Sequence, residues 1–288
     1  MSVFMDLNVT FSPDKQNMQQ LIDMAAHLGF STVAVNYTFE PATKKKQAIP
    51  APKPIDELID QLPIVQGRSR PIRVLNRLTL VMSELSHFRP NPTEYTGYDL
   101  LAVQPMTEKL FHAACTQLDV DIISVSVTEK LPFLFKRAPV NVALARGLAF
   151  EVSFASAIRD ATLRRYTIAN AVSLMEACKG KNVLLSSGAE KPLELRGPYD
   201  IINLCSLIGL SDSDAKRSVS CVCRSLLLHA ETRKTASGVI FTQKTCSTSP
   251  SQQEAAPPLG GTGEGTPCRG DGPAAKRLKS QLTEDSQT

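Results

Sequence analysis

The sequence predicts an α/β fold, because strand-like and helix-like patterns alternate along its first 241 of 288 residues. Strands that alternate with helices pair in parallel, and eight of them in a row indicate a closed, TIM-barrel-like sheet. One such barrel takes roughly 250 residues, and a composition with 42% hydrophobic residues supplies its core. We therefore expect one barrel domain over residues 1–241.

The expected strands are eight short apolar runs. They are Val3–Leu7, Thr32–Asn36, Ile72–Met82, Leu100–Gln104, Ile122–Val127, Val140–Val142, Phe150–Phe154 and Val183–Ser186. The step from Val140 to Phe150 is only ten residues, which is too short for a full crossover helix. The barrel is therefore either distorted at that step or includes one run that is not a strand.

The expected helices begin at residues that cap helix N-termini well, namely Ser12, Thr107, Asp160 and Ser211. Gly29 follows the first helix where a C-terminal glycine is common. The last helix, from Ser211, carries apolar residues on one face, at Ala215, Val219, Val222 and Leu226. With the helix before it, Pro198–Ile208, it forms an αα-hairpin packed on the barrel, although a DNA-reading helix-turn-helix centred on Ser211–His229 is an alternative.

Composition and patterning exclude several classes of protein. No apolar run approaches the ~18 residues of a membrane helix, so we expect no membrane contact, and Met1–Phe11 lacks the pattern of a secretory signal. Seven cysteines without framework spacing favour free thiols in a reducing compartment. The net charge of +4 permits a nucleic-acid partner without requiring one.

The last part of the chain has a different composition, and residues 242–288 are expected to form a disordered tail. Gly, Pro, Ser and Thr make up 22 of the 46 residues in Gln243–Thr288, so little apolar surface is available for burial. Lys276, Arg277 and Lys279 form a short basic run that resembles a nuclear import signal. The run predicts a nuclear protein.

The sequence shows no dense catalytic or metal-binding pattern. None of the histidines is paired with another at two or four residues; they are His27, His87, His112 and His229. Cys221 and Cys223 form a lone C-x-C without the second pair that structural zinc needs. Asp119 and Asp121 could be acid–base partners, but they precede a strand, where a solvated turn is the favoured interpretation. We predict no catalytic residue, metal or cofactor.

Basic residues carry more information, because loops that follow strands form the functional face of a barrel. The loop after the fifth strand places Phe133 and Phe135 beside Lys136 and Arg137, a combination that suits base stacking and phosphate pairing. Lys44–Lys46 follow the second strand on the same side. For each cluster, an ordinary solvated surface is the competing interpretation.

Further cations extend the candidate RNA-binding set. Arg164 and Arg165 stand near a helix N-terminus, where the helix dipole disfavours cations unless an anion is bound. The remaining candidates are Arg68, Arg70, Arg196, Arg233 and Lys234. Together these clusters shift the interpretation toward an anionic polymer as partner.

Six segments together resemble the family of 30-kDa protein subunits of eukaryotic and archaeal ribonuclease P. They are Leu62–Pro71, Thr128–Arg137, Arg146–Glu151, Arg164–Ile168, Arg196–Asp200 and His229–Thr235. The resemblance implies a TIM-barrel-like, non-catalytic subunit of a ribonucleoprotein whose RNA removes the 5′ leader of precursor tRNA. It further implies that the chain stabilises this RNA and pairs with a small RRM-like subunit. It also implies a role in the related ribonuclease that acts on precursor rRNA, and a nuclear, specifically nucleolar, address.

The same fold is similar to that of the polymerase-and-histidinol-phosphatase phosphoesterases, which carry H-x-H after the first strand to bind metal. Here the corresponding residues are Asp6-Leu7-Asn8. This departure favours a scaffold over the alternative, a metal-dependent phosphoesterase using Asp6, Asp121 and the scattered histidines.

Overall fold

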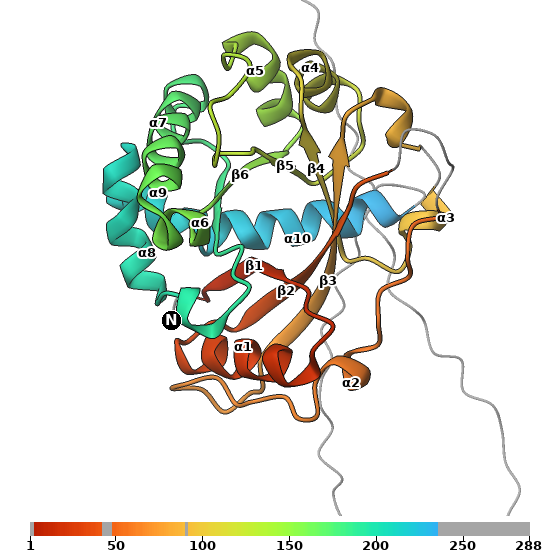
Figure 1. The fold of residues 1–288 in the computed structure, drawn as a ribbon, viewed down its shortest axis with the longest axis vertical. Helices are drawn as coiled ribbons and strands as arrows, with labels where there is room; N and C mark the ends of the chain where they lie inside the picture. The colour runs from red at the N-terminus through yellow and green to blue at the C-terminus, as the bar shows by residue number, and fades with distance from the viewer. Residues whose placement is uncertain (1–2, 42–47, 90–91, 236–288) are drawn as a thin grey trace, which may run out of the picture. The chain divides into compact units, whose positions relative to one another are not determined.

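The computed structural model describes residues 3–41, 48–89 and 92–235. Within them, seven parallel strands form one sheet in chain order. They are β1 (Met5–Thr10), β2 (Thr32–Phe39), β3 (Arg73–Met82), β4 (Leu100–Pro105), β5 (Ile122–Ser124), β6 (Ala149–Ser153) and β7 (Val183–Ser186). A parallel bridge joins Val9 of β1 to Ala189, just after β7, so the sheet is nearly closed into a barrel (Figure 1). The expected TIM-barrel-like fold is confirmed.

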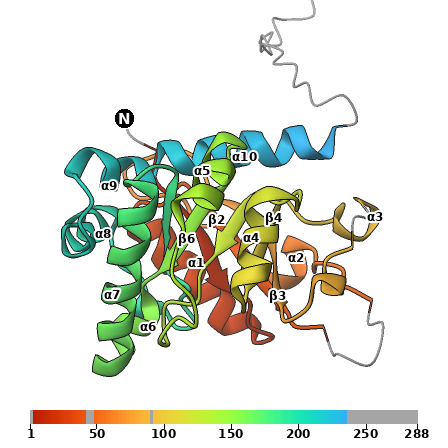
Figure 2. The same cartoon turned by 90° about the horizontal axis from the view of Figure 1, so that it is seen from above.

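Helices surround the sheet and cover its outer face (Figures 1 and 2). They are α1 (Lys15–His27), α2 (Ile55–Leu58), α3 (Pro92–Tyr95), α4 (Glu108–Thr116), α5 (Arg137–Ala145), α6 (Ala155–Arg159), α7 (Ala161–Cys178), α8 (Pro198–Cys205), α9 (Asp212–Ser218) and α10 (Cys221–Lys234). Short 3-10 helices add η1 (Leu85–His87), η2 (Pro192–Glu194) and η3 (Ser206–Ile208). None of the helices in the described ranges is both long and apolar enough to span a bilayer.

The N-caps follow the sequence closely. Thr107, Asp160 and Ser211 each accept a hydrogen bond from a backbone N–H in the first turn of their helices, as expected. At α1 the expected cap, Ser12, is wrong: Asp14 is the N-cap, and its carboxylate accepts from the backbone N–H two residues on. A helix start is thus fixed by the side chain that reaches the free backbone donors.

The strand expected at Val140–Val142 is wrong, because these residues lie inside α5. Val140 and Ala143, one turn apart, are buried on the core side of the helix, whereas Asn141 and Val142 are exposed. The true crossover therefore runs from Ser124 at the end of β5 to Ala149 at the start of β6 and has room for a helix. The short ten-residue step was the result of this one misassignment.

The last expected helix is also divided. α9 ends at Ser218 and α10 begins at Cys221. Between them the Val219 carbonyl accepts a hydrogen bond, 3.0 Å long, from the Met5 N–H at the start of β1. The break therefore ties this hairpin to the first strand.

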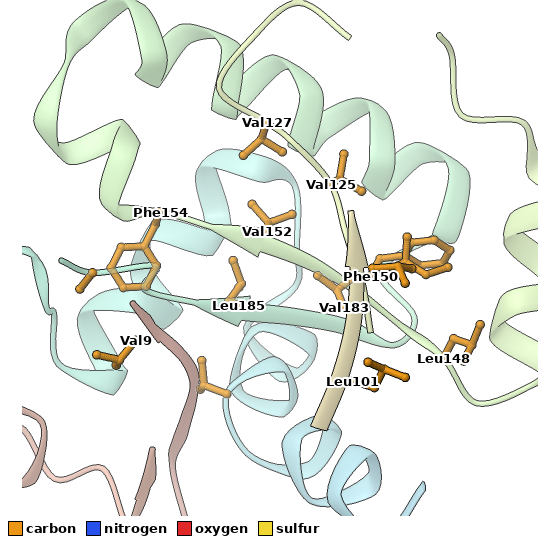
Figure 3. Packing of buried hydrophobic residues seen from close by; sticks show 14 of the residues in the cluster. Val9, Leu101, Val125, Val127, Leu148, Phe150, Val152, Phe154, Val183 and Leu185 are labelled. Atoms are coloured by element: carbon orange, nitrogen blue, oxygen red, sulfur yellow. The ribbon is translucent and has the colours of Figure 1, made fainter. Parts of the chain in front are cut away.

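The inside of the barrel has an apolar layer near the strand starts, here called the N-terminal end. α10 lies across this end and contributes to the layer, sealing it (Figures 1 and 2). Its members are Met5, Leu7, Ala34, Leu75, Leu100, Ala102, Ile122, Ala149 and Leu184 from the strands, with Val222, Cys223, Leu226 and Ala230 from α10. The opposite strand faces carry Phe150, Val152 and Val183, which pack against the surrounding helices (Figure 3).

Three expectations fall on residues outside the described ranges. They concern the basic stretch Lys44–Lys46, the tail over residues 242–288, and its import-like run with Lys276, Arg277 and Lys279. The tail and its boundary stay predictions.

Candidate RNA interface and the charged clusters of the barrel

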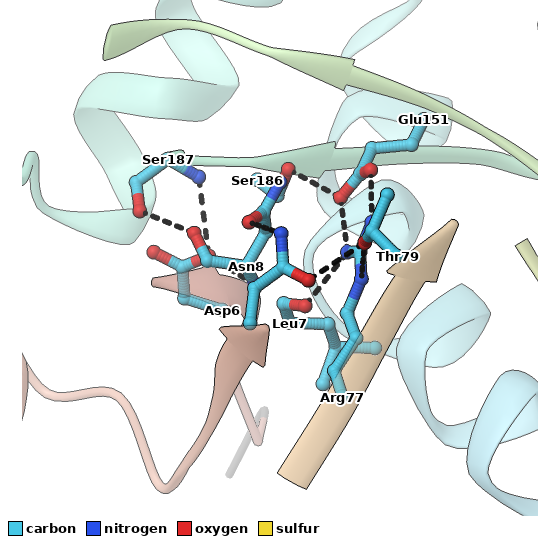
Figure 4. A network of polar contacts seen from close by, with 9 residues as sticks. Asp6, Leu7, Asn8, Arg77, Thr79, Glu151, Ser186 and Ser187 are labelled. Carbon is cyan, nitrogen blue, oxygen red and sulfur yellow. Dashed lines mark hydrogen bonds and ion pairs between the residues drawn. The ribbon is translucent and has the colours of Figure 1, made fainter. Parts of the chain in front are cut away.

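A buried ion pair occupies the barrel interior beyond the apolar layer. Arg77 of β3 and Glu151 of β6 form a bidentate pair between side chains that are both fully buried (Figure 4). Their strands place them on the inner face, two residues after Leu75 and Ala149 of the apolar layer. The pair therefore links opposite sides of the barrel.

Hydrogen bonds satisfy the rest of this pair. Besides binding Glu151, the Arg77 Nη1 donates to the Leu7 carbonyl at 2.8 Å, and the Arg77 Nε donates to the Thr79 hydroxyl. The Ser186 hydroxyl donates to Glu151 at 2.7 Å. Burial alone would raise the pKa of Glu151, but attraction to Arg77 and hydrogen bonds from Arg77, Ser186 and Ser124 lower it overall.

The same network reaches the first two strands. The Thr79 hydroxyl donates to the Asn36 side chain at 2.6 Å, and the Asn36 amide donates to Asn8 at 2.8 Å. These side chains are buried as well. Arg77 and Glu151 have no exposed surface, so this pair is structural and links β1, β3, β6 and β7 inside the barrel.

Asp6 fills the seam between β1 and β7, where an eighth strand would otherwise pair. One carboxylate oxygen accepts hydrogen bonds from the backbone N–H groups of Asn8 and Ser187, at 3.2 and 3.1 Å. The other oxygen is buried without a partner among the described residues. Burial is the main cause that raises the pKa of Asp6, to about 6.

A second charged cluster fastens α10 to the N-terminal end. The buried carboxylate of Asp121 accepts from Arg233, with the shortest contact 2.9 Å, and lies 2.8 Å from the His229 ring. It also accepts the backbone N–H of Leu101. The solvated turn expected for Asp121 is therefore wrong, whereas Asp119 is exposed as expected.

Arg233 and Lys234, both proposed from the sequence as RNA contacts, belong to this end. Arg233 has a side chain only 10% exposed and bound to Asp121, and Lys234 is 3.5 Å from Asp99. Arg68 and Arg70 lie in the turn that precedes β3, so they too belong to the end where the strands start. Their binding to RNA stays a prediction, but they do not share a face with the loops that follow the strands.

The loop between β5 and α5 stands at the opposite, C-terminal end and is held by an aromatic cluster. Phe133 and Phe135 pack on Phe111 of α4, with ring centroids 5.3 and 5.5 Å away. Phe133 is buried and Phe135 half-buried. These rings anchor the loop. Only Phe135 keeps part of its ring accessible for stacking with an RNA base.

This loop presents cations at the start of a helix. Lys136 is the N-cap of α5 and gives no side-chain cap, and Arg137 is the first helical residue. Lys136 is 72% exposed and pairs with Glu108 at 2.7 Å, while the side chain of the exposed Arg137 makes no hydrogen bond or ion pair within the described residues. Uncapped N–H groups, the positive end of the helix dipole and two cations together favour an anion here.

Arg164 and Arg196 line one groove in a different region, formed by α7 and the segment after β7, and Arg165 follows Arg164 on α7. Arg164 and Arg165 are exposed in the second turn of α7. The Arg164 Nε donates to the Ala157 carbonyl at 2.8 Å, and Arg196 donates to the Leu193 and Leu195 carbonyls. Arg164 and Arg196 flank an apolar groove that the sequence did not reveal.

The residues of the phosphoesterase alternative do not come together. Asp6 is bound in the β1–β7 seam, and Asp121 is bound to α10 at the N-terminal end. Among the residues that the structure describes, no three His, Cys, Asp and Glu side chains form a group able to hold a metal ion.

The helix-turn-helix alternative is also contradicted. The apolar face of α10, with Val222, Leu226 and Ala230, is buried in the end of the barrel. A recognition helix must expose its reading face to the DNA groove, whereas α10 packs across the N-terminal end of the barrel and closes it. The favoured interpretation, an αα-hairpin packed on the barrel, matches the arrangement of α8 and α9.

Sequence reasoning missed the network around Arg77 and Glu151 and the cluster around Asp121. A charged residue inside an otherwise apolar strand was the available signal at Arg77 and Glu151, because such a residue needs a partner when it is buried. For Asp121 no local signal exists, since its partners are 108 and 112 residues away in sequence.

Comparison with known proteins adds family evidence. Residues 3–235 match the family model described as RNase P subunit p30. The chain is 52% identical over 260 residues to ribonuclease P protein subunit p30 of Mus musculus, covering 89% of this chain and 97% of the mouse protein. It is 23% identical over 223 residues to ribonuclease P/MRP protein subunit RPP1 of Saccharomyces cerevisiae, covering 75% and 73%.

A solved structure is similar in fold. A chain from the cryo-EM structure of archaeal ribonuclease P with mature tRNA aligns with a TM-score of 0.57 at 13% identity. The alignment covers 83% of this chain and 98% of the archaeal chain. At this identity the likeness concerns the fold alone.

Proposed function

The chain belongs to the RNase P subunit p30 family, and from this premise we propose that it is a non-catalytic subunit of a ribonuclease P in which RNA is the catalyst. In this proposal the chain binds and stabilises the RNA of a particle that removes the 5′ leader of precursor tRNA, so its contact with precursor tRNA is indirect. Other protein subunits, a small RRM-like one among them, complete the particle.

The observation that carries RNA binding is the start of α5. Lys136 and Arg137 are exposed at a helix N-terminus without a side-chain cap. The aromatic packing on Phe111 holds this loop in place, so little conformational entropy is lost on binding. A phosphate here would pair with Arg137 and accept from the free backbone N–H groups of Arg137 and Ala138, while Lys136 would share its charge with Glu108.

Two further parts of the proposal are supported more indirectly. The yeast relative is a ribonuclease P/MRP protein subunit, which supports a second role in the related ribonuclease that acts on precursor rRNA. The basic run with Lys276, Arg277 and Lys279 supports a nuclear, and within the nucleus nucleolar, address. Deleting Pro273–Lys279 is expected to reduce nuclear accumulation of the full chain.

The test of the non-catalytic role is purification of the tagged chain from nuclear extract, followed by cleavage of a precursor tRNA before and after micrococcal nuclease. The nuclease is inactivated with a calcium chelator before substrate is added. We expect 5′ cleavage to be lost after digestion, because the catalyst is RNA. Cleavage that survives digestion, and that the recombinant chain reproduces alone, would overturn the proposal.

A further inference from the structure

An apolar groove lies between α7 and the α8–η3 segment. Its volume is about 290 Å³, and it is bounded by the ends of β6 and β7, by α6 and by these helices. Its lining residues are Val152, Phe154, Ala157, Ile158, Arg164, Thr167, Ile168, Leu185, Arg196, Ile201, Leu204, Cys205, Leu207 and Ile208. A space of this size accommodates one or two aliphatic side chains.

The rim of the groove is exposed although it is apolar. Leu204 is 41% exposed and Leu207 is 60% exposed, one turn apart on the α8–η3 segment. Exposed apolar surface of this kind is typical of a surface that a partner completes.

Charge specifies the chemistry of that partner. Arg164 and Arg196 are the charged residues in the lining of this groove, and Asp200 lines an adjoining hollow that shares Arg196. Backbone carbonyls hold both guanidinium groups, as described above, and each group keeps further N–H donors for a ligand. Two fixed guanidinium groups in the lining of an apolar groove complement a segment with aliphatic residues and carboxylates.

RNA fits this groove poorly. Stacking of bases on aromatic rings is not available, because the single aromatic residue in the lining, Phe154, is only 8% exposed. Bases stacked on the guanidinium groups of Arg164 and Arg196 would cover the arginines but not the apolar floor. A phosphate would pair with either arginine but would leave the apolar floor uncovered. The tail of the chain is a weaker candidate, because its charges balance and it has only three large aliphatic residues.

We propose that this groove, flanked by Arg164 and Arg196, docks an acidic amphipathic segment of another protein subunit. The inference rests on the proposed function, because it takes the partner from the same particle, but it assigns these arginines to protein rather than to RNA. Aliphatic side chains of the segment fill the groove, and its carboxylates pair with the two arginines. RNA binding through the start of α5 does not depend on it.

The test is photo-crosslinking in the assembled particle. Benzoylphenylalanine is placed at position 207 of the full tagged chain, and at position 228 as the control. Leu228 is 55% exposed on α10, so both positions are accessible. We expect a nuclease-resistant protein adduct from position 207 and not from position 228, and mass spectrometry should place it on a peptide with aliphatic residues and carboxylates within one or two turns.

Charge-reversal variants provide the second readout. Arg164→Glu with Arg196→Glu should lower the adduct yield about tenfold, which corresponds to about 1.4 kcal/mol of binding. The Lys replacements at these positions should retain most of the adduct, and Arg224→Glu, an exposed control on α10, should leave it unchanged. A thermal melt of each purified variant confirms folding.

Several outcomes would overturn the proposal. They are an adduct with RNA, with a second copy of this chain or with its own tail, no adduct, or a yield that survives the double reversal. The RNA content of the same particles is measured in parallel. Loss of the adduct with RNA retained supports the docking proposal, whereas an RNA-free particle that keeps the adduct would contradict the proposed function alone.

Discussion

At the N-terminal end of the barrel, the cations of α10 are bound to carboxylates: Arg233 to the buried Asp121, and Lys234 to Asp99. At the C-terminal end, Lys136 and Arg137 stand exposed at the start of α5, where Lys136 pairs only with the exposed Glu108 and Arg137 has no ion pair among the described residues. Both ends looked alike in the sequence, since each shows two adjacent basic residues.

The difference between these ends lies in the partners of the cations. A cation that already neutralises a buried carboxylate would have to leave it to bind a phosphate, and the uncompensated carboxylate would then be costly. The Arg137 side chain has no such bond to break. Exposure and pairing, rather than the presence of basic residues, therefore distinguish the two ends, and the proposal assigns a structural role to the N-terminal end and RNA binding to the C-terminal end.

The largest expected loss of folding stability comes from mutating the buried Arg77–Glu151 pair in the core between the two ends. Glu151→Ala leaves Arg77 buried and unpaired, so the free energy of unfolding should fall by about 4–5 kcal/mol. Urea denaturation of the full chain measures this. Replacing both partners, with Arg77→Met and Glu151→Leu, should lose clearly less. If Glu151→Ala alone costs under about 1 kcal/mol, the pair does not hold the barrel together.

Mutations at the N-terminal end, where Asp121 fastens α10, should give the next largest loss of stability. Asp121→Ala removes the partner of Arg233 and His229, and we expect it to cost about 3 kcal/mol, because the carboxylate is buried but its partners are partly exposed. Arg233→Ala should cost a similar amount or less. In urea denaturation, a double-mutant cycle between Asp121 and Arg233 should give a coupling above about 1 kcal/mol. Additive effects would contradict the bond that fastens α10.

The seam between β1 and β7 predicts a pH dependence. The pKa of Asp6 is raised by burial from 3.8 to about 6, so the folded state binds this proton more tightly than the unfolded state. Its contribution to stability is complete below pH 3.8 and is lost as pH rises through about 6. We expect Asp6→Asn to gain stability relative to the parent chain, by up to about 3 kcal/mol, between pH 4 and pH 7.

Urea midpoints of both proteins across that pH range provide the measurement. Comparing the two proteins cancels the contributions of groups that do not interact with Asp6. Glu151 interacts with Asp6, because its charge helps to raise the pKa of Asp6, and its own lowered pKa acts in the opposite direction. A stability difference that stays constant from pH 4 to pH 7 would contradict the raised pKa of Asp6.

The sequence predicted those parts of the fold that local chemistry determines. Side-chain caps at Thr107, Asp160 and Ser211 start their helices as expected, because each bond is made within a few residues. Val140–Val142 was misassigned, since two β-branched residues around Asn141 alternate as in a strand. The spacing of Val140 and Ala143 by one helical turn, and a glycine just after the helix, are the more reliable sequence signals. In the structure Gly147 has a positive φ of 82°.

The site was less predictable, because its residues meet through the closed barrel. Arg77 and Glu151 are 74 residues apart in sequence, and Asp121 and Arg233 are 112 apart. The basic residues of the loop before α5 were identified from the sequence. The groove lined by Arg164 and Arg196 was not, because it forms only where α7 packs against the α8–η3 segment. Such groupings follow from tertiary packing rather than from spacing along the chain.

The measurement that tests the division into two ends most directly is the salt dependence of RNA binding. Lys136→Ala with Arg137→Ala should reduce the slope of log affinity against log salt by about 1.4 for single-stranded contacts, or about 1.8 for duplex contacts. The matched control, Lys216→Ala with Arg224→Ala, removes an exposed lysine and arginine from α9 and α10. It should leave the slope unchanged. An unchanged slope in the first variant, or an equal reduction in both, would contradict the account.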